Sequence, residues 1–420
     1  MPNEREENLS QTLIFQKGLE VGLLGQQFFP EGVLVNSESL PQRISETKDL
    51  IEKGQTIIYE AAFEFNSTYC AVDILVKENN RWYAYEVKST NSIKDQFIKD
   101  LALQYYVLNG VGLNLHDVYV VHLNKHYIRN GELSLNDLFI RVSVLDQVIN
   151  LQRDVESKVT EFTNVLGQNE EPKILTGSHC EKPYHCDFYS YCSKDLVHEE
   201  IDYGEPSFNA KAINDFIRSL QYPLYFMDFE TWITAIPEYD GHWPYRQVNF
   251  QYSLHVQSSA GSEIVHYEYL AEGPHTLQRE FIESLLTQIG EYGSIIVYNQ
   301  AFENTRLKEL KNEFPDLEER ISSVQERIAD LMVPFRRRDI YIPEMKGSYS
   351  IKYVLPALVP EMNYDNLKIR NGEEASSAFY SLKNIDHENE RNEIRKSLLE
   401  YCGQDTLAMV KILDKLKEYV

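Results

Sequence analysis

The sequence lacks long apolar runs and has few cysteines. No stretch of about 18 apolar residues occurs in the 420 residues, so we expect no membrane-spanning helix. Residues 1–7 are polar and acidic, unlike a secretory signal, so we expect a cytoplasmic protein. The odd number of cysteines, five, then argues against a disulfide framework.

Positive charge is also scarce. The chain has 41 Lys and Arg against 65 Asp and Glu, which gives a formal net charge of −24. This balance counts against a protein that coats duplex DNA by bulk electrostatics. It is compatible with a nuclease, because such an enzyme concentrates carboxylates at its metal ions and needs basic residues only along the substrate track. The length predicts two or three domains.

The segment Tyr225–Trp232 carries two carboxylates in an otherwise apolar run. In a strand, Asp228 and Glu230 project from the same face, because residues two apart share a face. Like charges side by side on a strand repel each other. A divalent cation held between them removes this cost, so the pair predicts a site for Mg²⁺ or Mn²⁺.

A second set of charged residues is expected on a hairpin in the first half. Glu78-Asn79-Asn80-Arg81 is typical of a tight turn. A two-residue turn there pairs Asp73 with Glu86 across the hairpin, and Lys88 shares their face. Two carboxylates can hold a metal, and a Lys can stabilise charge that develops on a phosphate. An exposed, ion-paired strand face is the alternative interpretation.

Three of the five cysteines lie close together in the sequence, at Cys180, Cys186 and Cys192. Their spacing, with Pro and aromatic residues between them, indicates ligands of an iron–sulfur cluster or of zinc. The fourth ligand is open between Cys70, His179 and His185, or is absent. Incidental cysteines in a loop are the alternative.

Helical patterns extend over residues 92–108, 145–166, 317–333 and 388–420, and we expect the last helix to be interrupted near Gly403. Interleaved with strand-like runs, they predict an α/β protein.

The first half resembles a RecB-like nuclease of the PD-(D/E)XK superfamily, of the cluster-containing kind found among CRISPR-associated adaptation nucleases. Asp73…Glu86-x-Lys88, the helix with Gln104 and Tyr106, and the trailing cysteines carry the resemblance. It implies a restriction-endonuclease-type mixed sheet over residues 1–197 and a four-iron (4Fe–4S) cluster. Two features of that family are missing, because Gly22 stands in place of a His ligand and no cysteine precedes Cys70.

The second half, residues 209–420 after a linker at 198–208, resembles the DEDD exonucleases of the ribonuclease H-like superfamily, in their Tyr-containing subclass. Its motifs are Asp228-Phe229-Glu230, then Asn299…Phe302-Glu303, then Tyr401-x3-Asp405. The middle motif usually ends in Asp, whereas this chain has Glu303. The two carboxyl-terminal motif residues are four apart, so they share a helix face.

From these patterns we predict a metal-dependent nuclease that shortens single-stranded DNA or RNA in the 3′→5′ direction. Asp228, Glu230, Glu303 and Asp405 are the expected ligands of two Mg²⁺ or Mn²⁺ ions, and Tyr401 is expected to orient water. As nucleic-acid contacts we expect Asn299, Gln104 and Lys352. Two alternatives stay open. One places catalysis at Asp73, Glu86 and Lys88, and the other is an inert nucleic-acid-binding protein.

Overall fold

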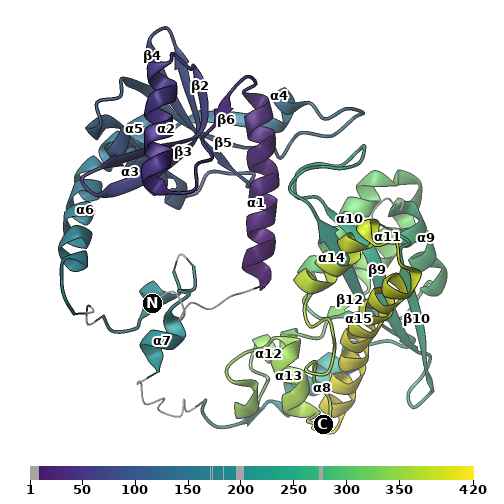
Figure 1. Cartoon of the computed structure of the whole chain (residues 1–420). Coiled ribbons are helices and arrows are strands. Elements are labelled where there is room, and N and C mark those ends of the chain that lie inside the picture. The colour runs from purple at the N-terminus through teal and green to yellow at the C-terminus, as the bar shows by residue number, and fades with distance from the viewer. Residues whose placement is uncertain (1–8, 171, 173, 183, 195–202, 274–277) are drawn as a thin grey trace. The chain divides into compact units, whose positions relative to one another are not determined.

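The computed structural model describes residues 9–170, 172, 174–182, 184–194, 203–273 and 278–420. The protein is mixed α/β and divides into two compact units (Figure 1). Unit 1 contains residues 1–197 together with 234–246, and unit 2 contains residues 198–233 and 247–420. Each unit has its own sheet and its own core. Among the described helices, none is both long enough and apolar enough to cross a bilayer.

Unit 1 is built on a six-stranded sheet whose strands follow each other in sequence order. The β1–β2 and β4–β5 pairs are parallel, and the other neighbours are antiparallel. The strands are β1 (Val33–Leu34), β2 (Ile57–Phe65), β3 (Thr68–Glu78), β4 (Arg81–Lys88), β5 (Leu115–Leu123) and β6 (Phe139–Ser143).

The β3–β4 hairpin has the register that its turn predicts. Asn79 and Asn80 both have positive φ, 48° and 63°, as a two-residue turn that matches the strand twist requires. Glu78 lies opposite Arg81, and the same register continues down the hairpin. The side chains of Asp73 and Glu86 are therefore neighbours, as expected.

Helices cover both faces of this sheet. One face packs on α2 (Leu40–Glu52), α3 (Asp95–Gly110), α5 (Leu145–Asn150) and α6 (Gln152–Leu166). The other face packs on α1 (Leu9–Phe28) and α4 (Leu135–Leu138). The cysteine segment carries a single turn at Ser178–Cys180 and the short helix α7 (Tyr189–Ser193).

Residues 234–246 belong to unit 1 although they lie far from it in sequence. The Arg129 guanidinium donates to the Pro237 carbonyl at 3.0 Å, and the Gly131 amide donates to Asp240 Oδ1 at 2.7 Å. The side chain of Ala235 joins the core around α1.

Unit 2 is built on a five-stranded sheet in the order β10-β9-β8-β11-β12. The pairs β10–β9 and β9–β8 are antiparallel, and β8–β11 and β11–β12 are parallel. Its strands are β8 (Leu224–Ile233), β9 (Gln247–Gln257), β10 (Ile264–Leu270), β11 (Ser294–Val297) and β12 (Ile328–Asp330). A separate two-stranded ribbon pairs β7 (Ser207–Phe208) with β13 (Ile340–Tyr341).

Alternating side chains of β8 face two different layers. Tyr225, Met227 and Phe229 pack into an apolar core formed with α9 (Gln278–Gln288), α10 (Ala301–Glu313) and α11 (Glu318–Glu326). The opposite face is covered by α14 (Gly372–Ser381) and α15 (Glu388–Lys417). The remaining helices are α8 (Ala210–Ser219), α12 (Val333–Arg336) and α13 (Ile351–Leu358).

The structure corrects several expected elements. Residues 317–333 do not form one helix, because α11 ends at Glu326 and β12 follows. The last helix, α15, runs through Gly403 without interruption, and 145–166 is two helices rather than one. Residues 198–202 of the expected linker lie outside the described residues, and its last two residues form β7.

Candidate functional site

Strand β8 places Asp228 and Glu230 on the face opposite the apolar core. Asp228 lies across from Ser253 of β9, and Glu230 lies across from Gln251. The pairing of β8 with β9 shifts register between Glu230 and Thr231, directly after the second carboxylate. The alternation expected for a strand thus presents both acids to the layer of helices above.

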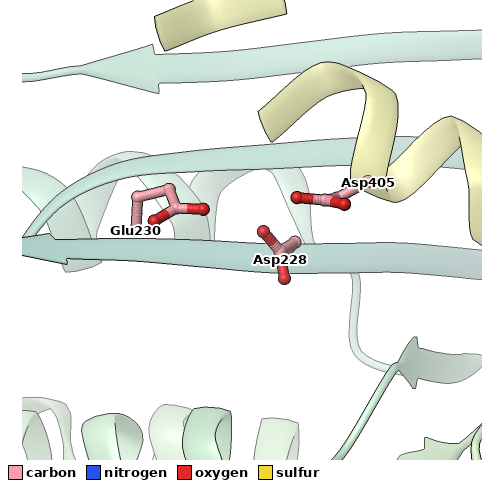
Figure 2. Close-up of side chains that lie close together, drawn as sticks. All are labelled: Asp228, Glu230 and Asp405. Atoms are coloured by element: carbon pink, nitrogen blue, oxygen red, sulfur yellow. The ribbon is translucent and has the colours of Figure 1, made fainter. Parts of the chain in front are cut away.

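Helix α15 brings Asp405 to the same place. One carboxylate oxygen from each of Asp228, Glu230 and Asp405 lies within 4.8 Å of the other two, and the three point toward one another (Figure 2). Within the described ranges, this is the one group of three or more His, Cys, Asp or Glu side chains that is close enough to hold a common ion.

Burial and mutual repulsion dominate the electrostatics of this group. Glu230 and Asp405 are buried, and Asp228 is half-buried. Desolvation, followed by the charge of Asp405, raises the pKa of both Asp228 and Glu230 well above the ordinary carboxyl range. Desolvation also raises the pKa of Asp405, to about 6, although a hydrogen bond from Tyr364 and the charge of Lys352 oppose the shift.

Glu303 interacts electrostatically with Asp228 and Glu230 but does not join the group within 4.8 Å. It lies in the first turn of α10 and is 1% exposed, and burial raises its pKa to about 8. Its charge raises the pKa of Asp228 and Glu230 further. Glu303 Oε2 is buried and has no hydrogen-bond partner among the described residues. A buried, unsatisfied carboxylate oxygen is costly unless a cation or a proton accompanies it.

Tyr401 and Lys352 border the carboxylates as well. Tyr401 is buried one helical turn before Asp405 and hydrogen-bonds to it, and burial raises the pKa of its phenol. Lys352 is exposed, and its ammonium opposes the rise in the pKa of Glu230 and Asp405 that burial causes, so it lies near both. Its Nζ also donates to the Arg370 carbonyl.

Asn299 lies on the loop that follows β11. Its side chain is exposed and its φ is +76°, and its backbone N–H donates to Asp330 Oδ1 at 3.0 Å. The same oxygen of Asp330 accepts from the Met332 amide at 3.0 Å. Asp330 thus fixes the loop between β11 and α10, the helix that carries Glu303, and no sequence pattern indicated this role.

Sequence reasoning missed three further residues around the acids. The Tyr364 hydroxyl donates to Asp405 Oδ1 at 2.6 Å, and the Cys402 thiol lies 3.6 Å from Asp228 Oδ2. A Cβ at Gly372 would lie 3.6 Å from Glu230 Oε2. The adjacency of Cys402 to Tyr401 on α15 was a usable signal, whereas Tyr364 and Gly372 reach the site only through the tertiary fold.

The donor set fits a hard divalent cation. All the candidate ligand atoms of the three clustered acids are carboxylate oxygens, which Mg²⁺ and Mn²⁺ prefer. The raised pKa values and the unsatisfied oxygen of Glu303 both indicate negative charge that lacks a counter-ion.

The predicted residues of unit 1 also come together, in a separate cavity. Asp73, Glu86 and Lys88 all line a cavity of about 1160 Å³, whose wall is completed by α1 and by residues 184–188. Asp73 Oδ2 accepts the Val87 amide at 2.7 Å. Lys88 Nζ donates to Glu86 Oε1 at 2.7 Å and to Asp100 Oδ2 at 2.9 Å.

One residue of this cavity region differs from expectation. Gln104 is buried, and its amide donates to Glu86 Oε2 at 2.8 Å, so it positions a carboxylate instead of facing a nucleic acid. Glu60 of β2 also lines the cavity, and its charge adds to the rise in the pKa of Asp73 that burial and the charge of Glu86 cause. Gly22 also lines the cavity, and a Cβ there would meet nothing within 4 Å.

The three trailing cysteines do not assemble around one ion. Sulfurs bound to a single Zn²⁺ at about 2.3 Å can be no more than about 4.6 Å apart. Cys180, Cys186 and Cys192 do not form such a group in the described part of the chain. Cys180 is buried, Cys186 is half-buried and Cys192 is exposed. This arrangement does not fit zinc, and an iron–sulfur cluster stays a prediction.

Comparison with known proteins gives matches without an assigned activity. Residues 225–350 match the family described as "Domain of unknown function (DUF2779)". "Uncharacterized protein UU173" of Ureaplasma parvum is 26% identical over 234 residues, which cover 50% of this chain and 33% of that protein. "Uncharacterized protein MG366 homolog" of Mycoplasma pneumoniae is 27% identical over 214 residues, which cover 46% of this chain and 32% of that protein.

The chain therefore spans about a third of the length of these curated relatives. The matched family region begins one residue into β8 and contains Asp228, Glu230 and Glu303. It ends before α13, so Tyr364, Tyr401 and Asp405 lie beyond it.

Proposed function

We propose that this protein is a metal-dependent nuclease and that unit 2 removes nucleotides from the 3′ end of single-stranded nucleic acid. The observation that carries the proposal is the convergence of Asp228, Glu230 and Asp405 within 4.8 Å on a buried sheet face. Tyr401, one turn before Asp405, and Glu303, beside the group, support it. The direction of shortening comes from the resemblance to the Tyr-containing DEDD exonucleases.

In this proposal, the side chains of unit 2 have separate roles in metal binding and in the orientation of water. Asp228, Glu230 and Asp405 would hold the divalent cations, and Glu303, whose Oε2 has no hydrogen-bond partner among the described residues, would be a further ligand. Bound Mg²⁺ or Mn²⁺ supplies an activated water and stabilises the charge on the leaving oxygen. The phenol of Tyr401 stays protonated, because its pKa is raised, and it can orient the water by a hydrogen bond.

Lys352 supplies the positive charge for a substrate phosphate. Its ammonium is exposed and close to Glu230 and Asp405, so it can reach a phosphate held at the carboxylates. Because the overall charge of the chain is −24, such local cations have to offset a repulsive field. The local contact between Lys352 and a phosphate should weaken as salt is added.

The reaction can be tested with oligonucleotides that carry a label at the 5′ end. We expect single-stranded DNA or RNA to give a ladder of shortening products with Mg²⁺ or Mn²⁺ and none with EDTA. Retention of full-length DNA and RNA with either metal would contradict the proposal and favour a binding protein without catalysis.

A second candidate places hydrolysis in unit 1. The specific observation in its favour is the large cavity that contains Asp73, Glu86 and Lys88. Glu60 and Asp187 also line this cavity, and Lys88 is paired with Glu86 and Asp100. A closed single-stranded DNA circle distinguishes the candidates, since a 3′ exonuclease needs an end. Cleavage of the circle that is lost in Lys88→Met would assign an endonuclease activity to unit 1.

A further inference from the structure

A tyrosine outside the predicted motifs contacts one of the clustered acids. The hydroxyl of Tyr364 donates to Asp405 Oδ1 at 2.6 Å, a length typical of a hydrogen bond to a charged acceptor. Tyr364 is 6% exposed and lies on the loop that follows α13, 41 residues before Asp405. Its phenol is therefore held inside the unit and directed at the carboxylate site.

The loop around Tyr364 is anchored to α15 next to the acid. The Gln404 side-chain amide donates to the Asn363 carbonyl, which fixes the backbone one residue before Tyr364. The ring of Tyr364 lies 6.4 Å from that of Tyr401 at an interplanar angle of 62°. Two phenols from different segments thus contact the same carboxylate, one from α15 itself and one from the loop.

This arrangement affects how Asp405 can serve as a ligand. An Asp side chain has a broad, roughly two-fold preference at its second torsion angle, so the carboxylate plane is set by its contacts. With Oδ1 held by Tyr364, the rotation of the group is fixed, and Oδ2 is left free of this hydrogen bond. Mutation of a residue that orients a metal ligand in this way typically lowers metal affinity by about 10–100-fold.

We propose that Tyr364 is a positioning residue that sets the affinity of the Asp228, Glu230 and Asp405 group for a divalent cation. The proposal rests on the proposed function of unit 2, because it assumes that the acids bind a cation. It adds a residue that belongs neither to the three exonuclease-like motifs nor to the matched family region.

The test measures Mn²⁺ binding to the full chain by isothermal titration calorimetry and by the loss of the free Mn²⁺ electron paramagnetic resonance signal. Tyr364→Phe removes one hydroxyl, and we expect Mn²⁺ binding to weaken by about 10–100-fold. Tyr252→Phe is the matched control. It removes another buried phenol, which bonds Ser284 at 2.8 Å on the opposite face of the sheet, and it should leave Mn²⁺ affinity unchanged.

A second variant guards against a folding defect in Tyr364→Phe. Gln404→Ala removes one of the contacts that hold the loop on α15 but keeps the phenol, so we expect a smaller loss of Mn²⁺ affinity in the same direction. Wild-type Mn²⁺ affinity in both Tyr364→Phe and Gln404→Ala would overturn the positioning role of Tyr364 and leave the proposed function of unit 2 unaffected. If wild type binds no Mn²⁺ that depends on Asp228, the proposed function fails together with it.

Discussion

At the scale of single residues, the site of unit 2 buries carboxyl groups close to one another, which disfavours their charged forms. Asp228, Glu230 and Asp405 are brought together on a buried face, where desolvation, followed by the charge of Asp405, raises the pKa of Asp228 and Glu230. Such a cluster lowers stability in the absence of a cation, because burial disfavours the charged forms. Functional sites of this kind commonly lower the free energy of unfolding of the protein that carries them.

Neutralising one of the acids should therefore stabilise the metal-free protein. For Asp228→Asn we expect a gain on the order of 1 kcal/mol, about 2–4 °C in the midpoint of unit 2, measured by scanning calorimetry in EDTA. Asp316→Asn is the control, since Asp316 is exposed and paired with Arg279, so that change should lower stability slightly. A midpoint for Asp228→Asn below that of wild type would contradict this account of the cluster.

The pH dependence follows from the same shifts. Unfolded carboxyl groups titrate near about pH 4, whereas the pKa is about 6 for Asp405 and about 8 for Glu303 in the fold. Between the unfolded and the folded pKa of each group, the folded state binds more protons than the unfolded chain. The contribution of Asp405 and Glu303 to the free energy of unfolding therefore falls as pH rises through this range. A bound cation replaces those protons, and its stabilising effect should therefore grow over the same range.

This dependence can be measured as the rise in melting temperature on adding Mg²⁺, from about pH 5 to about pH 8. We expect the rise to increase with pH in wild type and to be absent in Asp228→Asn. A rise that is constant or that shrinks with increasing pH would show that these acids do not compete with protons for the ion.

At the scale of elements, what the sequence could predict depended on how local the determining contacts are. The register of the β3–β4 hairpin follows from Asn79 and Asn80, so the neighbours Asp73 and Glu86 were predictable. Strand β12 was not, because it has only three residues and is held by parallel pairing with β11. Its helix-like surroundings gave no local signal of that pairing.

Helix α1 offers a test of its packing through its glycines. A Cβ at Gly25 would approach the methyl groups of Val87 to 2.8 and 3.0 Å, so Gly25→Ala should destabilise unit 1 by about 1–3 kcal/mol. A Cβ at Gly22 meets nothing within 4 Å, and Gly22→Ala should stabilise by about 0.5–1 kcal/mol through helix propensity. Urea denaturation of the two variants measures both effects, and equal signs would mean that α1 does not pack on β4 as described.

At the scale of the whole molecule, the chain carries two acidic sites on two sheets. The pairing of Asp228 with Glu230, and of Tyr401 with Asp405, followed from strand and helix periodicity. That these two pairs lie close together in the fold was expected only from the resemblance to the DEDD exonucleases, because no local sequence pattern relates β8 to α15. The assignment of residues 234–246 to unit 1 and the contact of Tyr364 with Asp405 depend on tertiary contacts across long sequence separations, and no pattern indicated them.

The most direct test of the central claim is the initial rate of release of the 3′-terminal nucleotide from a single-stranded oligonucleotide with Mg²⁺. It should be compared between wild type, Asp228→Asn and Lys88→Met under one set of conditions. We expect a loss of more than about 100-fold in Asp228→Asn, because a metal ligand is removed, and a rate close to that of wild type in Lys88→Met. Release that persists in Asp228→Asn but disappears in Lys88→Met would contradict it and would place the chemistry in unit 1.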